Sequence, residues 1–388
     1  MQKKIIALAV AAALTAPVAA FAEANVYGLV DLSIDMVNDG RVVDPATGNK
    51  VSTTTTNQLV SNVSRVGVKG SEDLGGGLSA VWQMEGEVGM DTGAFGGFNR
   101  NTYIGLASAD MGKVILGRHD VPYKMATRKL DVFADSAADN RKLMGFGVMD
   151  ARLSNVIAYV SPNLSGLTIA AASEMGAELA AQTNPGAAPG TGAVTPTKGS
   201  ALSLAGMYTM DAIYATAAYQ TIKFGSAGTG DLAAGGLAKF AAVDDKATSI
   251  KLGGGYTMDQ ITVNAIFESN TFSSAAVGAT PASEYKVTNL YLAGKFALSA
   301  TDAVKVAYTM KGEGKVDGAG QNDKASQIAL GYDHDMSKNT TVYAMYTKVT
   351  DDGTVNQTTG GAGIPGANQV AGSNADPSVI SVGIKHSF

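Results

Sequence analysis

The feature that most restricts the fold of this chain is a strict two-residue alternation of side-chain polarity near both ends. Alternate positions from Val26 to Met36 carry apolar or small side chains, and Asp31, Ser33 and Asp35 lie between them. Residues 378–388 repeat the pattern up to the terminal phenylalanine. Successive side chains of a β-strand point to opposite faces. The pattern therefore predicts strands with one apolar and one polar face.

Turn signals divide the rest of the chain into similar segments, residues 60–70 among them, and about 16 strands are predicted in all. Short turns alternate with long, polar connections of low complexity. These long connections are residues 37–57, 119–150, 176–199, 225–245, 269–284, 312–322 and 351–376. Short turns at one end and long loops at the other are typical of outer-membrane barrels.

A closed sheet explains why these strands keep one apolar face. Backbone groups in lipid need protein partners, so an open sheet edge is not tolerated there. Barrels of about 16 strands enclose an aqueous lumen, which can carry the polar side chains. The predicted fold is therefore an all-β, 16-stranded antiparallel transmembrane barrel with short periplasmic turns and long extracellular loops. The alternative is a soluble periplasmic β-sandwich, whose strands also alternate.

Composition excludes several other functions. The chain has 388 residues, no Cys and three His, so it offers no disulfide framework, thiolate metal site or His-based metal centre. A formal charge of −5 argues against a general nucleic-acid binder. No motif of an enzyme or of a nucleotide site is present, and the dipeptide His119-Asp120 is weak evidence for a catalytic triad. We expect no enzyme activity, cofactor or metal.

Residues 1–22 have the features of a secretory signal peptide. Lys3 and Lys4 precede a short apolar stretch, and the segment ends in Ala20-Phe21-Ala22. The apolar stretch is shorter than the about 20 residues that a spanning helix needs. We expect cleavage before Glu23, export to the outer membrane of a Gram-negative cell, and a barrel domain over residues 23–388.

With this layout the sequence resembles the general porins of Gram-negative bacteria. The matching stretches are VYGLVD (26–31), SRVGVKGSEDLG (64–75), GLSAVWQ (77–83), NRNTYIGL (99–106), LGR (116–118) and VGIKHSF (382–388). The resemblance covers the chain after residue 22 and keeps the order of its parts.

The resemblance implies a homotrimer that passes ions and small hydrophilic solutes by passive diffusion. It also implies contact with outer-membrane lipid and lipopolysaccharide, and recognition of Phe388 by the barrel-assembly machinery. In this family the third long loop, here residues 119–150, folds into the lumen and narrows it. The implied constriction residues are the wall arginines Arg65, Arg100, Arg118 and Arg152 and the loop acids Asp131, Asp135 and Asp139.

Several features of the sequence bear on the selectivity of such a channel. Alternation independently places Arg65 with Gly67 and Lys69, on the face opposite Val66 and Val68. The loop lacks the Pro-Glu-Phe-Gly turn of the family, and the position after Tyr27-Gly28, basic in some members, is Leu29. The loop also carries four basic residues beside its acids: Arg128, Lys129, Arg141 and Lys142.

The sign of the field at the narrowest point therefore stays open, and we expect weak selectivity without a tight, saturable site. Two alternatives remain. One is a substrate-preferring channel of the same fold, for example for organic anions. The other is a surface adhesin whose long loops carry the function.

Overall fold

In the computed structural model, the described residues are 23–38, 40, 42–43, 50–51, 55–144, 149–175, 199–224, 245–274, 281–321, 323–351 and 376–388. The predicted signal segment 1–22 and much of the predicted long loops lie outside them. The described part of the chain includes no helix long and apolar enough to span a membrane.

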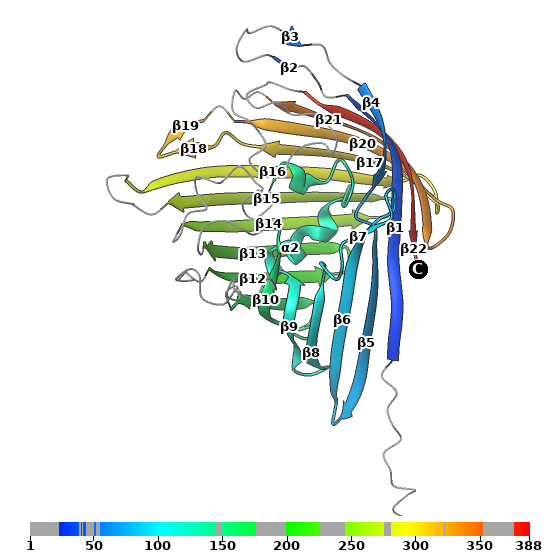
Figure 1. Cartoon of the computed structure of the whole chain (residues 1–388), viewed down its shortest axis with the longest axis vertical. Helices are drawn as coiled ribbons and strands as arrows, with labels where there is room; N and C mark the ends of the chain where they lie inside the picture. The colour runs from blue at the N-terminus through cyan, green and yellow to red at the C-terminus, as the bar shows by residue number, and fades with distance from the viewer. Residues whose placement is uncertain are drawn as a thin grey trace, which may run out of the picture.

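Long antiparallel strands make up almost all of the described chain (Figure 1). They are β1 (Glu23–Asn38), β4 (Thr55–Ser61), β5 (Arg65–Gly75), β6 (Leu78–Gly89), β8 (Thr102–Ser108), β9 (Gly112–Asp120), β10 (Arg152–Val160), β11 (Leu167–Glu174), β12 (Ser200–Met210), β13 (Ile213–Lys223), β14 (Lys246–Met258), β15 (Ile261–Ser274), β16 (Ser283–Ala297), β17 (Asp302–Lys311), β20 (Ala325–Asp335), β21 (Thr340–Asp351) and β22 (Ser378–Ser387). Short strands complete the set: β2 (Val42–Val43), β3 (Lys50–Val51), β7 (Ala94–Phe95), β18 (Lys315–Val316) and β19 (Ala319–Gly320). With β4 and β5 taken as two parts of one interrupted strand, the sheet confirms the predicted 16-stranded barrel.

The barrel closes where the first strand meets the last. β1 pairs antiparallel with β22, from Leu29 opposite Ser387 to Asn38 opposite Ser378. The register continues to the chain end, where the amide of Gly28 donates to the Phe388 carbonyl over 3.0 Å and the Phe388 amide donates back over 3.2 Å. On its other side β1 pairs with β4 and β5. β1 therefore has no free edge along this stretch, as a spanning sheet requires.

The two faces of the strands differ as the alternation predicts. On β1, Ile34 is 65 % exposed on the outer face, whereas its neighbour Asp35 is 1 % exposed inside the barrel. Val382 and Ile384 on β22 continue the exposed apolar surface. The prediction of an apolar outer face and a polar inner face is thus confirmed for the strands that close the barrel.

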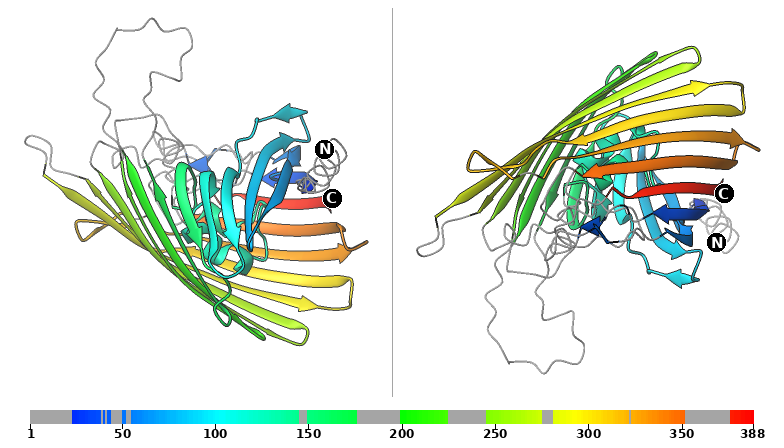
Figure 2. Two further views of the ribbon diagram at one scale, coloured as in Figure 1. Left: turned by 90° about the horizontal axis from the view of Figure 1, so that it is seen from below. Right: turned by 90° about the horizontal axis from the view of Figure 1, so that it is seen from above.

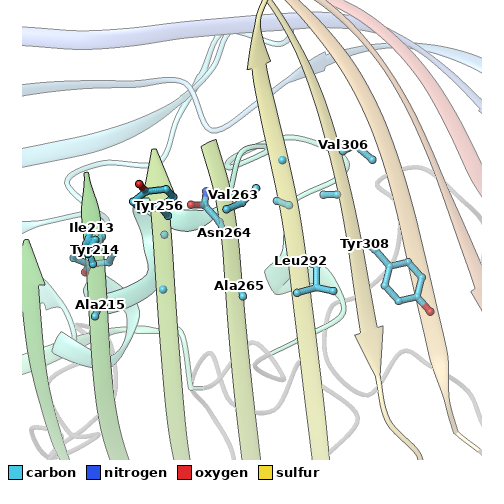
Figure 3. Close-up of a pocket in the computed structure, with 15 residues that line it drawn as sticks. Ile213, Tyr214, Ala215, Tyr256, Val263, Asn264, Ala265, Leu292, Val306 and Tyr308 are labelled. Atoms are coloured by element: carbon cyan, nitrogen blue, oxygen red, sulfur yellow. The ribbon is translucent and has the colours of Figure 1, made fainter. Parts of the chain in front are cut away.

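The outer face carries one broad hollow over β13–β17 (Figure 3). Small residues such as Ala215, Gly254 and Ala265 form its floor, and larger apolar side chains such as Leu292 and Tyr308 border it. The hollow has a cavity volume of about 830 Å³ and belongs to the surface that faces lipid.

The strand predicted over residues 60–70 is broken between β4 and β5. Val63 has a φ of 54°, a left-handed conformation that is rare for a β-branched residue. Inward polar groups hold the break: Asn62 Nδ2 donates to Ser33 Oγ over 2.8 Å, and Ser64 Oγ donates to the Asp31 carbonyl over 3.0 Å. The break lies directly before Arg65 and turns the chain there.

One predicted loop is largely strand. β15 continues to Ser274 and β16 begins at Ser283, so most of the described part of 269–284 belongs to a hairpin. Asn270 and Phe272 are fully buried at alternate positions inside the barrel. Because one of these inward residues is polar and the other apolar, the sequence shows no two-residue alternation of polarity here.

The third long loop lies inside the barrel. It contains α2 (Pro122–Thr127) and two 3₁₀ turns, η1 (Arg128–Leu130) and η2 (Asn140–Lys142). Val121, Tyr123 and Ala126 are fully buried and belong to one apolar cluster with the alanines of the inner wall. Figure 1 shows α2 against the green strands β12–β14, and Figure 2 shows the loop between these strands and the blue strands of the opposite wall.

Candidate functional site

The third long loop (119–150), which we call the lumen loop, is attached to the inner wall at several points. Wall side chains donate to its backbone carbonyls: Tyr214 to Ala126 over 2.6 Å, Asn264 to Leu130 over 2.8 Å, and Gln327 to Ala137 over 3.3 Å. These donors lie on β13, β15 and β20. The loop thus follows the inside of one wall instead of crossing the lumen freely.

A buried polar network holds the two ends of the loop. We call Lys251, Glu268, Tyr123 and Asp150 the β14–β15 anchor. Lys251 Nζ lies 2.8 Å from both carboxylate oxygens of Asp150 and 3.5 Å from Glu268 Oε1. The Tyr123 hydroxyl donates to Glu268 Oε1 over 2.7 Å.

All four anchor residues are buried. Burial first, and then the charges of Glu268 and Asp150, raise the pKa of Tyr123 well above its ordinary value, so its hydroxyl remains a donor. The Gln220 amide also donates to the Met149 carbonyl beside the anchor, over 2.8 Å.

The charged side of the loop forms an ion cluster of three acids and two arginines. Arg141 Nη2 lies 2.7 Å and Arg128 Nη1 3.0 Å from Asp139 Oδ2. Arg128 also pairs with Asp135. Asp131 lies deeper, where it accepts from the Tyr291 hydroxyl over 2.9 Å, and Arg128 is 3.8 Å away.

The carboxyl groups of the cluster differ in acidity. Burial, followed by the charge of the neighbouring Asp139, raises the pKa of Asp131 to about 6. Burial also acts to raise the pKa of Asp135, but the three nearby arginines outweigh it and hold this pKa below its ordinary value. Asp139 responds in the same way, and Arg141 and Arg128 hold its pKa far below the ordinary range. Asp131 is therefore the acid of the three that changes charge near pH 6.

Arg65 on β5 connects the opposite wall to the loop. Its guanidinium donates to Asp135 Oδ2 and to the Val63 carbonyl, each over 3.3 Å. The structure thus brings together Arg65 and Asp135, which the resemblance implies should face one another. Both side chains are partly exposed, which leaves the contact open to water.

Two other wall arginines pair with acids of their own wall. Arg100 Nε lies 2.5 Å from Glu85 Oε1, and Arg152 Nη2 lies 3.0 Å from Asp120 Oδ1. Arg152 also donates to the Asn101 side chain over 2.8 Å. Asp120 is shared with Lys124, whose Nζ lies 2.7 Å from Asp120 Oδ1. Among the described residues, neither arginine forms an ion pair with Asp131, Asp135 or Asp139.

Arg118 differs from the sequence expectation. It follows Val114 and Leu116 at two-residue spacing, and both of these side chains are exposed on the outer face of β9. Arg118 donates to the Asn99 carbonyl and to Ser154 Oγ, each over 2.8 Å. The alternation of the strand turns it away from the lumen, because Gly117 and His119 occupy the inward positions beside Tyr103.

Several residues of the site escape a reading of the sequence. Arg128 and Arg141 act as partners of the acids, a role that the resemblance assigns to arginines of the wall. Arg128 precedes Asp131 by three residues, a spacing that places both on one side of a helical turn. Arg141 follows Asp139 by only two residues, so this rule does not predict their pairing. The anchor acid Glu268 and its partner Lys251 lie on neighbouring strands, far in sequence from Tyr123. No local pattern signals that contact.

Within the described residues, no group of three or more His, Asp or Glu side chains has the arrangement of a metal site. The loop acids Asp139 and Asp150, for example, have arginine or lysine partners. The arrangement can hold a strong local electric field between the loop and the opposite wall.

Comparison with known proteins agrees with this geometry. The sequence model of the Gram-negative porin family matches residues 7–354. Outer membrane porin protein 32 of Delftia acidovorans is 38 % identical over 179 residues, which are 43 % of this chain and 47 % of that protein. Major outer membrane protein P.IB of Neisseria meningitidis is 35 % identical over 168 residues, 43 % of this chain and 48 % of that protein. Each alignment spans about half the length of the relative.

Solved structures match over nearly the whole chain. The anion-selective porin from Comamonas acidovorans superposes with a TM-score of 0.68 at 23 % identity, over 95 % of this chain and 100 % of that one. OmpF of Salmonella typhi, in a complex with daunomycin, gives a TM-score of 0.61 at 15 % identity, over 95 % and 98 %. These likenesses confirm the fold, and the relatives place the protein in the outer membrane. The chain therefore belongs to the Gram-negative porin family.

Proposed function

We propose that this protein forms a water-filled channel through which ions and small hydrophilic solutes diffuse passively across the outer membrane. The observation that carries the proposal is the two-sided lumen loop. Its apolar side packs against the wall of β12–β17, and its charged side contacts Arg65 on the opposite wall. Charged side chains are tolerated at this depth because they contact water instead of lipid.

The balance of charges in the passage supports weak ion selectivity. Over residues 119–150 the loop has five Asp against three Lys and two Arg, so its formal charge is zero. Arg100 is paired with Glu85, and Arg152 shares Asp120, which is already counted in the loop, with Lys124. Paired opposite charges produce a transverse field without a large net potential, and pore charge together with width sets ion preference.

We extend the proposal to the rest of the assembly. The barrel forms a homotrimer in contact with lipid and lipopolysaccharide, residues 1–22 are removed on export, and Phe388 is recognised during barrel assembly. The channel needs no cofactor, metal or catalytic step. A trimeric form is named among the structures of similar fold, for OmpT of Vibrio cholerae.

Planar-bilayer recording of the detergent-purified protein tests the channel. We expect stepwise conductance increases, with closures grouped in threes, and reversal potentials near zero in a salt gradient. A well-folded barrel that never conducts would contradict the proposal and favour the adhesin. A strong reversal potential would instead favour the substrate-preferring channel.

A further inference from the structure

A second hollow lies inside the barrel, beneath the lumen loop. It has a cavity volume of about 380 Å³, within the range of about 300–1,000 Å³ that is usual for small-molecule sites. Its lining residues are Met125, Arg128, Lys129, Thr168, Met207, Thr209 and Tyr214. The wall residues among them occupy inward positions on β11–β13, where Thr168 is opposite Met207 and Thr209 is opposite Tyr214.

The hollow contains one cation without an acidic partner among the described residues. Lys129 Nζ lies 3.3 Å from Thr209 Oγ1 and 3.3 Å from the centre of the Tyr214 ring. Arg128, in contrast, is already paired with Asp135 and Asp139. The Lys129 side chain is exposed, so an anionic solute can reach it, and partial burial lowers its pKa. An anion beside Nζ would accept a charge-assisted hydrogen bond.

The other walls of the hollow are apolar and adaptable. The thioethers of Met125 and Met207 contribute flexible, polarisable surface, which suits irregular apolar groups. The Tyr214 ring is held in place because its hydroxyl donates to the Ala126 carbonyl over 2.6 Å. The hollow thus combines one positive charge and hydroxyl groups with an apolar wall.

We propose that this hollow is a weak binding subsite for a monocarboxylate with an aromatic or other apolar body. The carboxylate accepts hydrogen bonds from Lys129 Nζ and Thr209 Oγ1, and the apolar body packs against Met125, Met207 and the Tyr214 ring. A single unpaired cation favours a monoanion over a dianion. The proposal rests on the proposed channel, through which such a solute reaches the hollow.

The site must release its ligand as readily as it takes it, because a channel with a tight site would be blocked. The inference therefore refines the expectation of no tight, saturable site: binding is saturable but weak. Thr209 lies close to the short turn at Asp211, which places the hollow on the periplasmic side of the loop.

The test uses benzoate as the probe. Acetate, which has the same carboxylate but only a methyl group as its apolar body, is the comparison ligand. Chloride conductance of the purified channel is recorded while benzoate is added. We expect a saturable decrease with benzoate and a weaker effect of acetate. K129Q, which keeps most of the side-chain length, should raise the half-saturating benzoate concentration about tenfold, the equivalent of about 1.4 kcal/mol. K246Q is the matched control. It removes an exposed lysine at the first position of β14, outside the lining of the hollow, and should behave as wild type.

Binding is measured independently by saturation-transfer NMR on the barrel in detergent micelles. A conducting channel with a linear response to benzoate, or with equal affinities in K129Q and wild type, would overturn the subsite and leave the channel intact. Equal affinities for acetate and benzoate would contradict the proposed packing of the apolar body against Met125, Met207 and the Tyr214 ring. A barrel that binds benzoate in micelles but never conducts would overturn the channel and retain the subsite.

Discussion

At the scale of single residues, Arg65 contributes little to the stability of the folded barrel and much to the electric field in the passage. Its contact with Asp135 is partly exposed, and pairs of this kind contribute about 0–1 kcal/mol. Its charge nevertheless lies where the loop and the opposite wall approach each other. Its main contribution is therefore to the passage of ions.

The substitution R65Q tests this assignment. We expect a larger single-channel conductance and a shift of the reversal potential toward cations. One positive charge is lost, whereas the negative charge of Asp135 remains. The matched control is R118Q, which removes an arginine from the outer face of β9. Identical reversal potentials for R65Q and wild type would contradict the placement of Arg65.

Asp131 makes the passage sensitive to pH. With its pKa raised to about 6, the carboxyl takes up a proton as the pH falls through that value. The sign follows from the raised pKa: the native loop favours the protonated form, so this contribution to stability is complete below the ordinary pKa of 3.8 and is lost as the pH rises through 6.

We expect the preference for anions to increase between pH 7 and pH 5, when the cluster gains one positive charge. In D131N this part of the shift should vanish. In D135N it should persist, because the pKa of Asp135 is lowered. The informative quantity is the difference between the reversal-potential curves of D131N and wild type. Identical reversal-potential curves for D131N and wild type would contradict the assignment.

At the scale of elements, the lumen loop is held by tertiary contacts and not by its own helices. α2 has six residues and no side-chain cap, far below the length of a helix that is stable alone in water. Its position depends on the β14–β15 anchor and on wall donors such as Asn264. Loss of the anchor should therefore release the loop without opening the barrel.

K251M tests the anchor. Removal of one partner from a buried ion pair costs about 3–5 kcal/mol, because Asp150 and Glu268 lose the positive charge that balances them. We expect a larger and noisier single-channel current, with an unchanged strand content by circular dichroism. K251M/D150N/E268Q also removes the two negative charges that K251M leaves unbalanced, and its current noise should return part of the way to that of wild type. If K251M has the same current noise as wild type, other contacts suffice to hold the loop.

Much of this architecture could be predicted from the sequence, and the limits have physical causes. Alternation places Asp35 inside and Ile34 outside because the strand period is two. The same rule predicts the inward Arg65, yet it is ambiguous at Arg118, which lies near an irregular stretch with Gly117 at φ 140°. The partners of the loop could not be predicted, because Tyr123 and Glu268 meet only after the barrel has formed.

At the scale of the whole molecule, the ladder that closes the barrel extends to Phe388. The Phe388 backbone makes two hydrogen bonds with Gly28, and its ring is half exposed at the periplasmic end of the barrel. A hydrogen bond contributes about 1 kcal/mol net. The backbone and the ring of this residue therefore contribute separately.

Deletion of Phe388 should lower the temperature at which the folded barrel is lost, more than F388A does. F388A keeps both backbone hydrogen bonds and removes only the ring. The measurement is the heat-dependent mobility shift in detergent gel electrophoresis after refolding into vesicles. If F388A lowers that temperature as much as the deletion, the ring and not the backbone governs closure.

The pairing of β1 with β22 also affects how the molecule is made. β1 is synthesised first, but one row of its amides and carbonyls gains partners only when residues 378–388 arrive. Until then the growing sheet presents a bare edge, to which any extended segment can add. A chain interrupted before β22 is thus not a smaller pore but a template for aggregation, because β22 supplies the partners that satisfy the free edge of β1.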